Sequence, residues 1–207
     1  MQIQNIIVRN LGIVSYPPIH KAMQYFTNTR NVNTPDELWV LQHQPIYTLG
    51  QASKSEHLLN TNNIQIYQSD RGGQVTYHGP GQLIVYVLID IKRAKLGVKK
   101  LIYVLEQAII NCLSIFKINS NRRVHAPGVY VDCKKIAALG LRIRKGYSYH
   151  GLSLNIDMDL RPFKGINPCG YAGLEVTQIS DLIDKFEFKQ VKKQFLTCLL
   201  SELEHER

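Results

Sequence analysis

Cys169 is the residue of this chain whose surroundings most strongly suggest covalent chemistry. It lies in the segment INPCGY, residues 166–171, which shows neither helical nor alternating apolar periodicity. A proline before the cysteine and a glycine after it are typical of a tight turn, which could point the thiol into a cleft. Cys169 is therefore either a small residue in a tight loop or a nucleophile. The second role needs a cation or base nearby, because the reactive form of cysteine is the thiolate.

A glycine-rich segment, RGGQVTYHGPGQ at residues 71–82, is the second candidate for chemistry. Its glycines allow the backbone to approach a ligand closely and to present N–H groups to it. The nucleotide-binding patterns G-x-G-x-x-G and G-x-x-x-x-G-K-[ST] do not occur in this segment or elsewhere in the chain. Taken alone, the segment is equally compatible with a hairpin that has a glycine-rich loop. In that case His78 would be a hydrogen-bonded structural histidine.

Two further segments supply a lysine and a set of small residues. GVYVDCKKIAALG, residues 128–140, reads as a hairpin in which Lys135 opens the second strand. A lysine at such a position is usually solvated. The strand that follows is apolar and built of small residues, however, so Lys135 could instead lie at the edge of a pocket shared with Cys169. HGLSLNID, residues 150–157, is predicted as a strand in which Gly151 gives close access to the backbone.

Taken together, the four segments resemble the lipoyl(octanoyl) transferases. The resemblance rests on RGGQVTYHGPGQ, GVYV…KKIAALGLRI, HGLSLNID and INPCGYAG, and spans about residues 71–175. It implies the catalytic-domain fold of the biotin–protein and lipoate–protein ligases, and Cys169 as a nucleophile whose acid/base is Lys135. The residues that the resemblance implies for acyl binding are Arg71, Gly72, Gly73, Gln74, Val75, Thr76, Tyr77, His78, Ala138, Leu139, Gly140, Gly151, Leu152 and Ser153.

The same resemblance implies a two-step acyl transfer, the first step of endogenous protein lipoylation. The donor would be octanoyl-acyl carrier protein, whose acyl group would form a thioester on Cys169. The acceptors would be lysines of apo lipoyl domains in 2-oxoacid dehydrogenase complexes and of the glycine cleavage H protein. Thioester exchange is nearly balanced and amide formation from a thioester is downhill, so neither ATP nor another cofactor is expected. A metal is not expected either, because no two cysteines have the short spacing of a zinc site.

Two alternatives belong to different classes of protein. An ATP-dependent lipoate–protein ligase would resemble this chain around the pocket lysine, but it would not need the cysteine of INPCGY. A nucleic-acid binder would explain the formal net charge of +9. The chain lacks interleaved aromatic residues at recognition spacing and any familiar binding motif, so nucleic acid is not an expected partner.

The positive charge is concentrated in the middle of the chain. Residues 121–145 carry seven cationic side chains and one acidic one. Such a region attracts acidic partners over a long range, and acyl carrier proteins are acidic. We therefore expect glutamate substitutions in this region to slow acylation. The cations concerned are Arg122, Arg123, Arg142, Arg144 and Lys145.

These residues have to be positioned by a fold that contains both helices and strands. Apolar residues recur at helical spacing in residues 19–26, 101–116 and 191–203. Strands cluster between these helices without regular alternation, which indicates an α+β class. We expect a single domain over 1–207 with mixed sheets flanked by helices. The predicted strands are 38–42, 64–67, 83–89, 129–131, 136–143 and 149–156.

The composition is that of a globular protein, with 44% hydrophobic and 20% charged residues. The longest apolar run, residues 83–89, is far shorter than the roughly 20 residues that span a membrane. The first residues lack the features of a signal peptide, so we expect a cytoplasmic protein with no membrane partner and with reduced cysteines. Cys112 and Cys198 are predicted on buried helix faces, and Cys133 is predicted to be exposed.

Overall fold

The computed structural model describes residues 6–206, which fold into two β-sheets and three α-helices. The helices are α1 (Tyr16–Thr29), α2 (Val98–Ile115) and α3 (Phe188–His205). The strands are β1 (Ile7–Val14), β2 (Glu37–His43), β3 (Ile46–Leu49), β4 (Ile66–Gln68), β5 (Val75–His78), β6 (Gln82–Leu88), β7 (Asn121–Arg122), β8 (Val129–Val131), β9 (Lys134–Arg144) and β10 (Tyr147–Asn155). One sheet has the order β1-β2-β6-β10-β9-β8-β7, and the other has the order β4-β3-β5.

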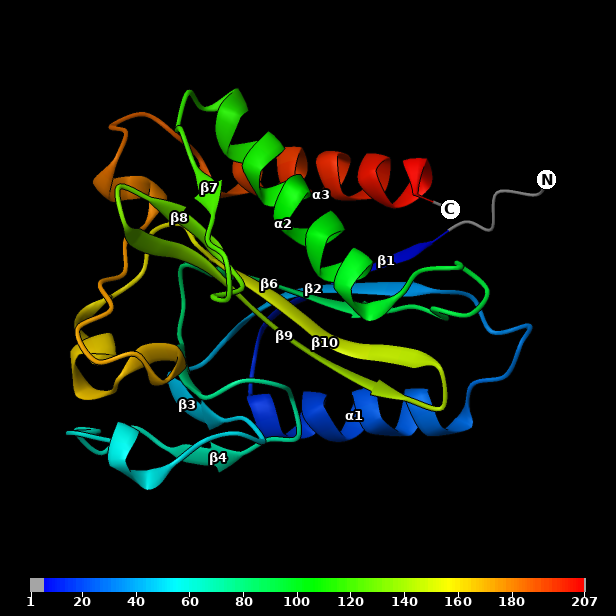
Figure 1. Ribbon diagram of the computed structural model, residues 1–207, viewed down its shortest axis with the longest axis horizontal. Helices are drawn as coiled ribbons and strands as arrows, with labels where there is room; N and C mark the ends of the chain where they lie inside the picture. Colours follow the sequence, from blue (N-terminus) through cyan, green and yellow to red (C-terminus); the bar gives the residue numbers. More distant parts are fainter. Residues whose placement is uncertain (1–5, 207) are drawn as a thin grey trace.

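Helices cover both faces of the larger sheet. Figure 1 shows α2 and α3 on one side of it and α1 on the other. The alternation of side chains along the central strands explains this arrangement. In β6, Leu83 and Val85 pack with α2 and α3, whereas Ile84 and Tyr86 pack with α1. Because both faces of β6 are buried, the strand reads as a continuous apolar run.

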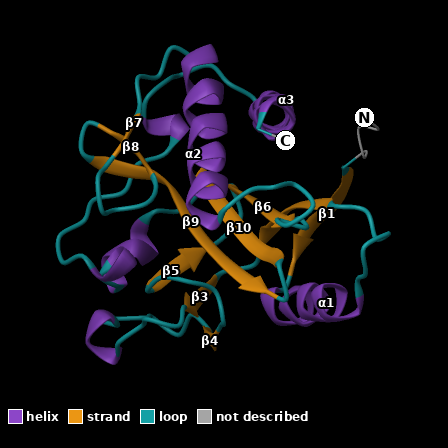
Figure 2. Cartoon of the chain, turned by 45° about the vertical axis from the view of Figure 1, so that its right-hand side comes forward, coloured by secondary structure: helices purple, strands orange, loops and turns teal. Residues whose placement is uncertain are grey.

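A long antiparallel hairpin, β9–β10, crosses the middle of the larger sheet (Figure 2). Its turn is Lys145-Gly146, and both residues have positive φ, of 55° and 88°. The shorter connection from β8 to β9 is Asp132-Cys133, with φ of 44° and 71°. Two-residue turns with this backbone match the twist of the strands they join. The β8–β9 turn thereby fixes the register that places Lys135 near the start of β9.

The expected α+β class is confirmed, with mixed sheets flanked by helices. The predicted helices and strands are present, with boundaries moved by a few residues. α1 begins at Tyr16, so both prolines lie in its first turn, where no helical N–H is needed. Among the described residues, no helix is long and apolar enough to cross a membrane.

The sequence patterns missed four strands: β1, β3, β5 and β7. β3 and β5 have four residues each and β7 has two, so these strands show little periodicity, although the three-residue β4 and β8 were found from their apolar residues. β1 is at the sheet edge and carries mostly exposed side chains. The predictions for three cysteines are resolved as well. Cys112 is buried and Cys133 is exposed, as expected, whereas Cys198 is only partly buried.

Candidate active site

Lys135 and Cys169 are in direct contact. The Lys135 Nζ donates a hydrogen bond to the Cys169 Sγ over 3.0 Å. It donates another to the Pro127 carbonyl over 3.1 Å and lies 5.2 Å from the centre of the Tyr130 ring. Only 4% of the Lys135 surface is exposed. An ammonium in contact with sulfur favours the thiolate, which is the nucleophilic form of cysteine.

A tight turn presents Cys169 to the lysine. Cys169 has φ 56° and ψ 17°, and Gly170 continues the turn with φ 78°. The Gly170 N–H donates to the Asn167 carbonyl over 2.9 Å, and the Asn167 N–H donates to the His57 carbonyl over 2.9 Å. Positive φ is uncommon outside glycine. The turn predicted from the flanking proline and glycine is therefore present, and it places the Cys169 sulfur against Lys135 of β9.

Backbone pairing fixes Lys135 from the other side. Its N–H donates to the Glu175 carbonyl over 2.9 Å, and its carbonyl accepts from the Thr177 N–H over 3.0 Å. These bonds connect β9 to the chain that follows the cysteine turn. Lys135 and Cys169 are therefore held in adjacent segments that are joined by backbone hydrogen bonds.

The charge state of Lys135 depends on the cysteine. Burial, the largest effect, lowers the pKa of Lys135. The negative charge of Cys169 and its hydrogen bond raise the pKa, with a smaller contribution from Tyr130, and together they leave it above the ordinary value. The lysine is thus an ammonium as long as the thiolate faces it.

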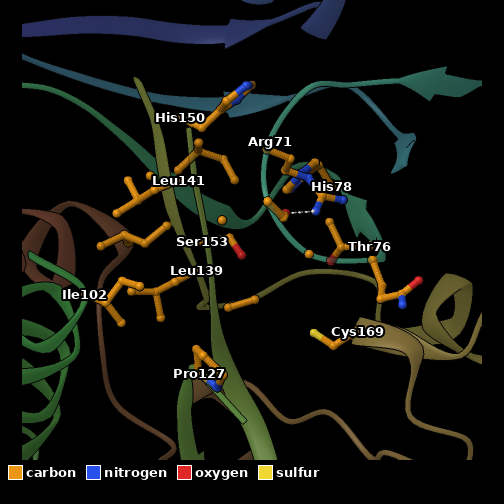
Figure 3. Close-up of a pocket in the computed structure, with 18 of the residues that line it drawn as sticks. Arg71, Thr76, His78, Ile102, Pro127, Leu139, Leu141, His150, Ser153 and Cys169 are labelled. Atoms are coloured by element: carbon orange, nitrogen blue, oxygen red, sulfur yellow. Dashed lines mark hydrogen bonds between the residues drawn. The ribbon is translucent and has the colours of Figure 1, made fainter. Parts of the chain in front are cut away.

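The pair lies beside a pocket of about 360 Å³. This is within the range of small-molecule sites, which are mostly apolar with a few polar groups. Figure 3 shows Cys169 and Pro127 at one end and Arg71 and His150 at the other, with Leu139 along the wall. Of the residues predicted to bind the acyl group, the pocket is lined by Arg71, Gly72, Gly73, Gln74, Val75, Thr76, His78, Ala138, Leu139, Gly140, Gly151, Leu152 and Ser153.

Tyr77 is the predicted site residue that does not line this pocket. Its side chain points to the opposite face of β5 and packs against Tyr47 and Phe163 in a separate apolar cluster. The pocket also has lining residues outside the predicted acyl-binding set, of which His150, Leu141 and Tyr171 lie within the quoted motifs. His150 directly precedes a predicted site residue, so its position was a usable signal. The others are Tyr16, Ile84, Tyr86, Val98, Ile102, Ala126, Pro127, Leu141 and Tyr171.

Arg71 holds the glycine-rich segment in place. Its guanidinium donates to the Thr48 carbonyl over 2.6 Å, to the Thr48 Oγ1 over 2.9 Å and to the Gly72 carbonyl over 3.0 Å. Only 8% of this residue is exposed. The arginine thereby ties residues 71 and 72 to β3, and these contacts define the shape of the pocket wall.

A polar network lies behind the far end of the pocket. The Asp70 carboxylate accepts from the His20 Nε2 over 2.6 Å, from the His150 Nε2 over 2.8 Å, from the Gln24 Nε2 over 3.1 Å and from the Tyr149 hydroxyl. Burial raises the pKa of Asp70, but these hydrogen bonds outweigh burial and hold the pKa well below its usual range. Burial also lowers the pKa of His150 to about 4, so this imidazole is neutral near pH 7.

His20, Asp70 and His150 are the described residues that could together offer ligand atoms to a metal, since these atoms lie within 4.8 Å of one another. Both imidazoles, however, are hydrogen-bonded directly to the same Asp70 oxygen. A tetrahedral zinc ion would need ligand atoms farther apart than 2.6 Å, given metal–ligand bonds of about 2.0 Å. The geometry fits a hydrogen-bonded network better than a metal centre. The expectation of no metal stays a prediction.

Comparison with solved structures gives the class of fold. The bipartite lipoate protein ligase of Thermoplasma acidophilum superposes with a TM-score of 0.75 at 16% identity, covering 97% of this chain and 85% of that one. A lipoate-protein ligase A bound with ATP gives 0.76 at 15% identity over 96% and 85% of the two chains. The biotin protein ligase of Aquifex aeolicus gives 0.59 at 15% identity over 98% and 71%. The fold is therefore that of the lipoate–protein and biotin–protein ligases, as expected.

Sequence comparison narrows this class. Residues 19–200 match the family model of the lipoyl protein ligase A/B catalytic domain, and the chain belongs to that family. An octanoyltransferase of Shewanella sp. strain ANA-3 is 58% identical over 182 residues, which are 88% of this chain and 84% of the relative. An octanoyltransferase of Vibrio campbellii is 52% identical over 202 residues, covering 98% and 92%. These relatives confirm the expected octanoyltransferase, an acyltransferase of protein lipoylation, over the ligase alternative.

Proposed function

We propose that this chain transfers an octanoyl group from a thioester donor to a lysine amine through a thioester on Cys169. The observation that carries the proposal is the 3.0 Å contact of Lys135 Nζ with Cys169 Sγ at the end of an apolar pocket. The ligase structures have the same fold, so the fold alone does not favour transfer. The pairing of a cysteine nucleophile, Cys169, with the Lys135 ammonium does favour transfer.

In the first step, the Cys169 thiolate attacks the thioester carbonyl of the donor. A bond forms between the Cys169 Sγ and the acyl carbon, and the bond from that carbon to the donor sulfur breaks. The leaving thiolate takes a proton from the Lys135 ammonium. The products are an acyl-enzyme with neutral Lys135 and a donor thiol.

In the second step, the lysine amine of the acceptor attacks the acyl-enzyme. The amide bond forms, the Cys169 sulfur leaves as a thiolate, and Lys135 takes the proton of the attacking amine. The change in Lys135 between the two steps follows from its environment. Acylation removes the Cys169 charge that raises the pKa of Lys135 and leaves burial, which lowers it. Lys135 can then act as the base.

The pocket suits a saturated acyl chain. Burying the methylenes of an octanoyl group contributes roughly 5 kcal/mol of binding, at about 0.8 kcal/mol per methylene. In this proposal the wall is made of the predicted acyl-binding residues that line the pocket, with Tyr77 supporting β5 from the opposite face. His78 and His150, both neutral near pH 7, lie toward the far end, and the Arg71 guanidinium there is engaged by the Thr48 and Gly72 carbonyls.

Octanoyl-acyl carrier protein is the donor in this proposal. Apo lipoyl domains of 2-oxoacid dehydrogenase complexes and the glycine cleavage H protein are the acceptors. We propose further that the chain acts in the cytoplasm as one catalytic domain over residues 1–207, with no nucleic-acid or membrane partner.

The test is the intact mass of the protein after mixing with octanoyl-acyl carrier protein, without ATP. We expect a gain of one octanoyl group that hydroxylamine removes and that an apo lipoyl domain takes up. Cys169→Ala should gain nothing, whereas the matched control Cys133→Ala, which removes an exposed thiol outside the pocket, should gain the group as the unchanged protein does.

Two results would overturn the proposal. One is an unchanged donor, with no acyl-enzyme and no loss of octanoate from the carrier protein. The other is modification of the lipoyl domain by free octanoate and ATP that persists in Cys169→Ala, because this would identify an ATP-dependent ligase.

A further inference from the structure

Glu106 is a buried carboxylate close to the site that the proposed mechanism does not use. It lies on α2 and is only 6% exposed. Its Oε1 accepts a hydrogen bond from the Gly128 N–H over 2.8 Å, and its Oε2 accepts from the Arg122 Nε over 3.1 Å. A buried carboxylate needs such partners, because burial of an unpaired charge is costly.

The Gly128 bond connects Glu106 to the catalytic lysine through one peptide unit. The N–H of Gly128 and the carbonyl of Pro127 belong to the same planar peptide group. Glu106 binds the N–H side of this group, and the Lys135 Nζ donates to its carbonyl over 3.1 Å. A continuous chain of contacts therefore runs from the Glu106 carboxylate through the peptide and Lys135 to the sulfur of Cys169.

Apart from the Glu106 bond, the segment that contains this peptide makes few hydrogen bonds among the described residues. Residues 123–127 have no helix or strand. The Tyr130 hydroxyl donates to the Ala126 carbonyl over 3.0 Å, and the exposed Tyr171 donates to the His125 carbonyl over 3.2 Å. The Glu106 bond ties the Pro127–Gly128 end of the segment to the core helix α2, whereas the bonds of Arg122 to α2 hold its other end.

Gly128 and Lys135 are closely packed, so the position of the peptide affects the lysine directly. Gly128 has φ 138°, and a Cβ there would lie 2.7 Å from the Ala137 carbonyl oxygen, 3.1 Å from the Lys135 Cε and 3.3 Å from its Nζ. The lysine side chain thus passes directly over the glycine. A small movement of the peptide would move the carbonyl that orients the ammonium.

We propose that Glu106 is a positioning residue for the Lys135–Cys169 pair. It fixes the Pro127–Gly128 peptide so that the Pro127 carbonyl directs the Lys135 ammonium at the Cys169 sulfur. Arg122 balances the buried charge of Glu106 and is itself held by the Gln107 Oε1 over 2.8 Å. The inference rests on the proposed function, since it assigns the support of the same pair.

The test measures the alkylation rate of Cys169 by iodoacetamide as a function of pH, in a Cys133→Ser background that removes the exposed thiol. In Glu106→Ala, Lys135 loses its fixed acceptor. We expect the inflection in the pH dependence of Cys169 alkylation to move to higher pH, toward that of Lys135→Ala. Octanoyl transfer should fall about tenfold, mainly in kcat.

Two more variants separate positioning from folding. Glu106→Gln retains an oxygen that accepts from the Gly128 N–H, so its inflection should lie closer to that of the unchanged protein than to that of Glu106→Ala. Glu106→Met fills the space without either oxygen and replaces Glu106→Ala if that variant does not fold. In Glu106→Met, the inflection in the pH dependence of Cys169 alkylation should move as it does in Glu106→Ala.

The matched control is Glu202→Ala on α3. Glu202 is a half-buried carboxylate that accepts from the Asn111 Nδ2 of α2 over 2.8 Å and does not line the pocket beside Cys169. Its loss should lower the melting temperature and leave the Cys169 inflection in place. If Lys135→Ala moves the inflection but Glu106→Ala and Glu106→Met do not, the inference alone is overturned. If Lys135→Ala leaves it unchanged, the proposed pair fails as well.

Discussion

At the scale of single residues, the backbone of the cysteine turn matters as much as the thiol. Cys169 and Gly170 both have positive φ, of 56° and 78°. Gly170 also lies against the glycine-rich segment, since a Cβ there would lie 2.9 Å from the Gln74 Cγ. The direction of the Cys169 side chain therefore depends on a neighbour that carries no side chain.

Gly170→Ala is expected to displace Cys169 from Lys135. The alanine meets both a left-handed backbone and the Gln74 side chain, and the turn has to shift. We expect acylation to slow about tenfold or more, because a small misplacement of a reacting group has a large effect on the rate. Rapid-quench measurement of acyl-enzyme formation from octanoyl-acyl carrier protein checks this.

Gly173→Ala is the matched control. Gly173 has φ 74°, and nothing lies within 4 Å of a Cβ at that position. The substitution has the same backbone cost, about 1–2 kcal/mol of stability, without the collision. Equal slowing of acylation in both variants would contradict the steric argument.

At the scale of elements, the cationic side chains of residues 121–145 lie along the whole length of the β9–β10 hairpin. Lys135 lies near the start of β9, whereas Lys145 lies in the turn, about 30 Å away at 3.3 Å per strand residue. Arg123 lies near the start, 4.5 Å from the Tyr130 ring that also faces Lys135. Arg122 is paired with Glu106, so it is not a free docking charge.

We expect Arg123→Glu to slow acylation by octanoyl-acyl carrier protein more than Lys145→Glu does, because the donor has to bring its thioester to Cys169. The effect should shrink as salt is added, since screening weakens attraction between exposed charges. Stopped-flow acylation rates at several salt concentrations check this.

Octanoyl-pantetheine, which has no protein part, is the control donor in the same experiment. Its rate should not differ between the two variants. If Arg123→Glu slows both donors equally, Arg123 acts on the reactive pair rather than on docking.

The elements also show how far the sequence predicts this protein. The helices and long strands were predictable because their periods extend over many residues, as in α3, where Val191, Phe195, Leu199 and Leu203 are all fully buried. The contact of Lys135 with Cys169 followed from the family resemblance and not from spacing, since 34 residues separate them. The role of Glu106 could not be predicted from the sequence, because its partners Arg122 and Gly128 are distant along the chain and contact it only in the folded protein.

At the scale of the whole molecule, the folded state holds several histidines in the neutral form. Burial lowers the pKa of His43 to about 4, of His78 to about 3 and of His150 to about 4. The hydrogen bonds agree with neutral rings: in His43, the Nδ1 donates to the Val14 carbonyl over 3.0 Å, and the Nε2 accepts from the Tyr86 hydroxyl over 2.6 Å.

The lowered pKa values of these buried histidines predict that the free energy of unfolding falls in mild acid. Their pKa values in the folded state lie below the unfolded value of about 6.5, so the unfolded state binds more protons between about pH 6.5 and 4. The free energy of unfolding is therefore highest above this range and falls as the pH falls through it. Each histidine contributes up to about 1.4 kcal/mol per pH unit. Urea unfolding at pH values from 7 to 4.5 measures the slope.

His43→Gln tests the assignment, because it removes one of these protons and keeps a side chain that can hydrogen-bond. We expect its stability to depend less steeply on pH than that of the unchanged protein, by up to about 1.4 kcal/mol per pH unit. His125→Gln, at an exposed position, is the control for replacing a histidine that is not buried. Parallel slopes for His43→Gln and the unchanged protein would show that the acid sensitivity comes from other groups, such as the Asp70 network, which loses its charge only at lower pH.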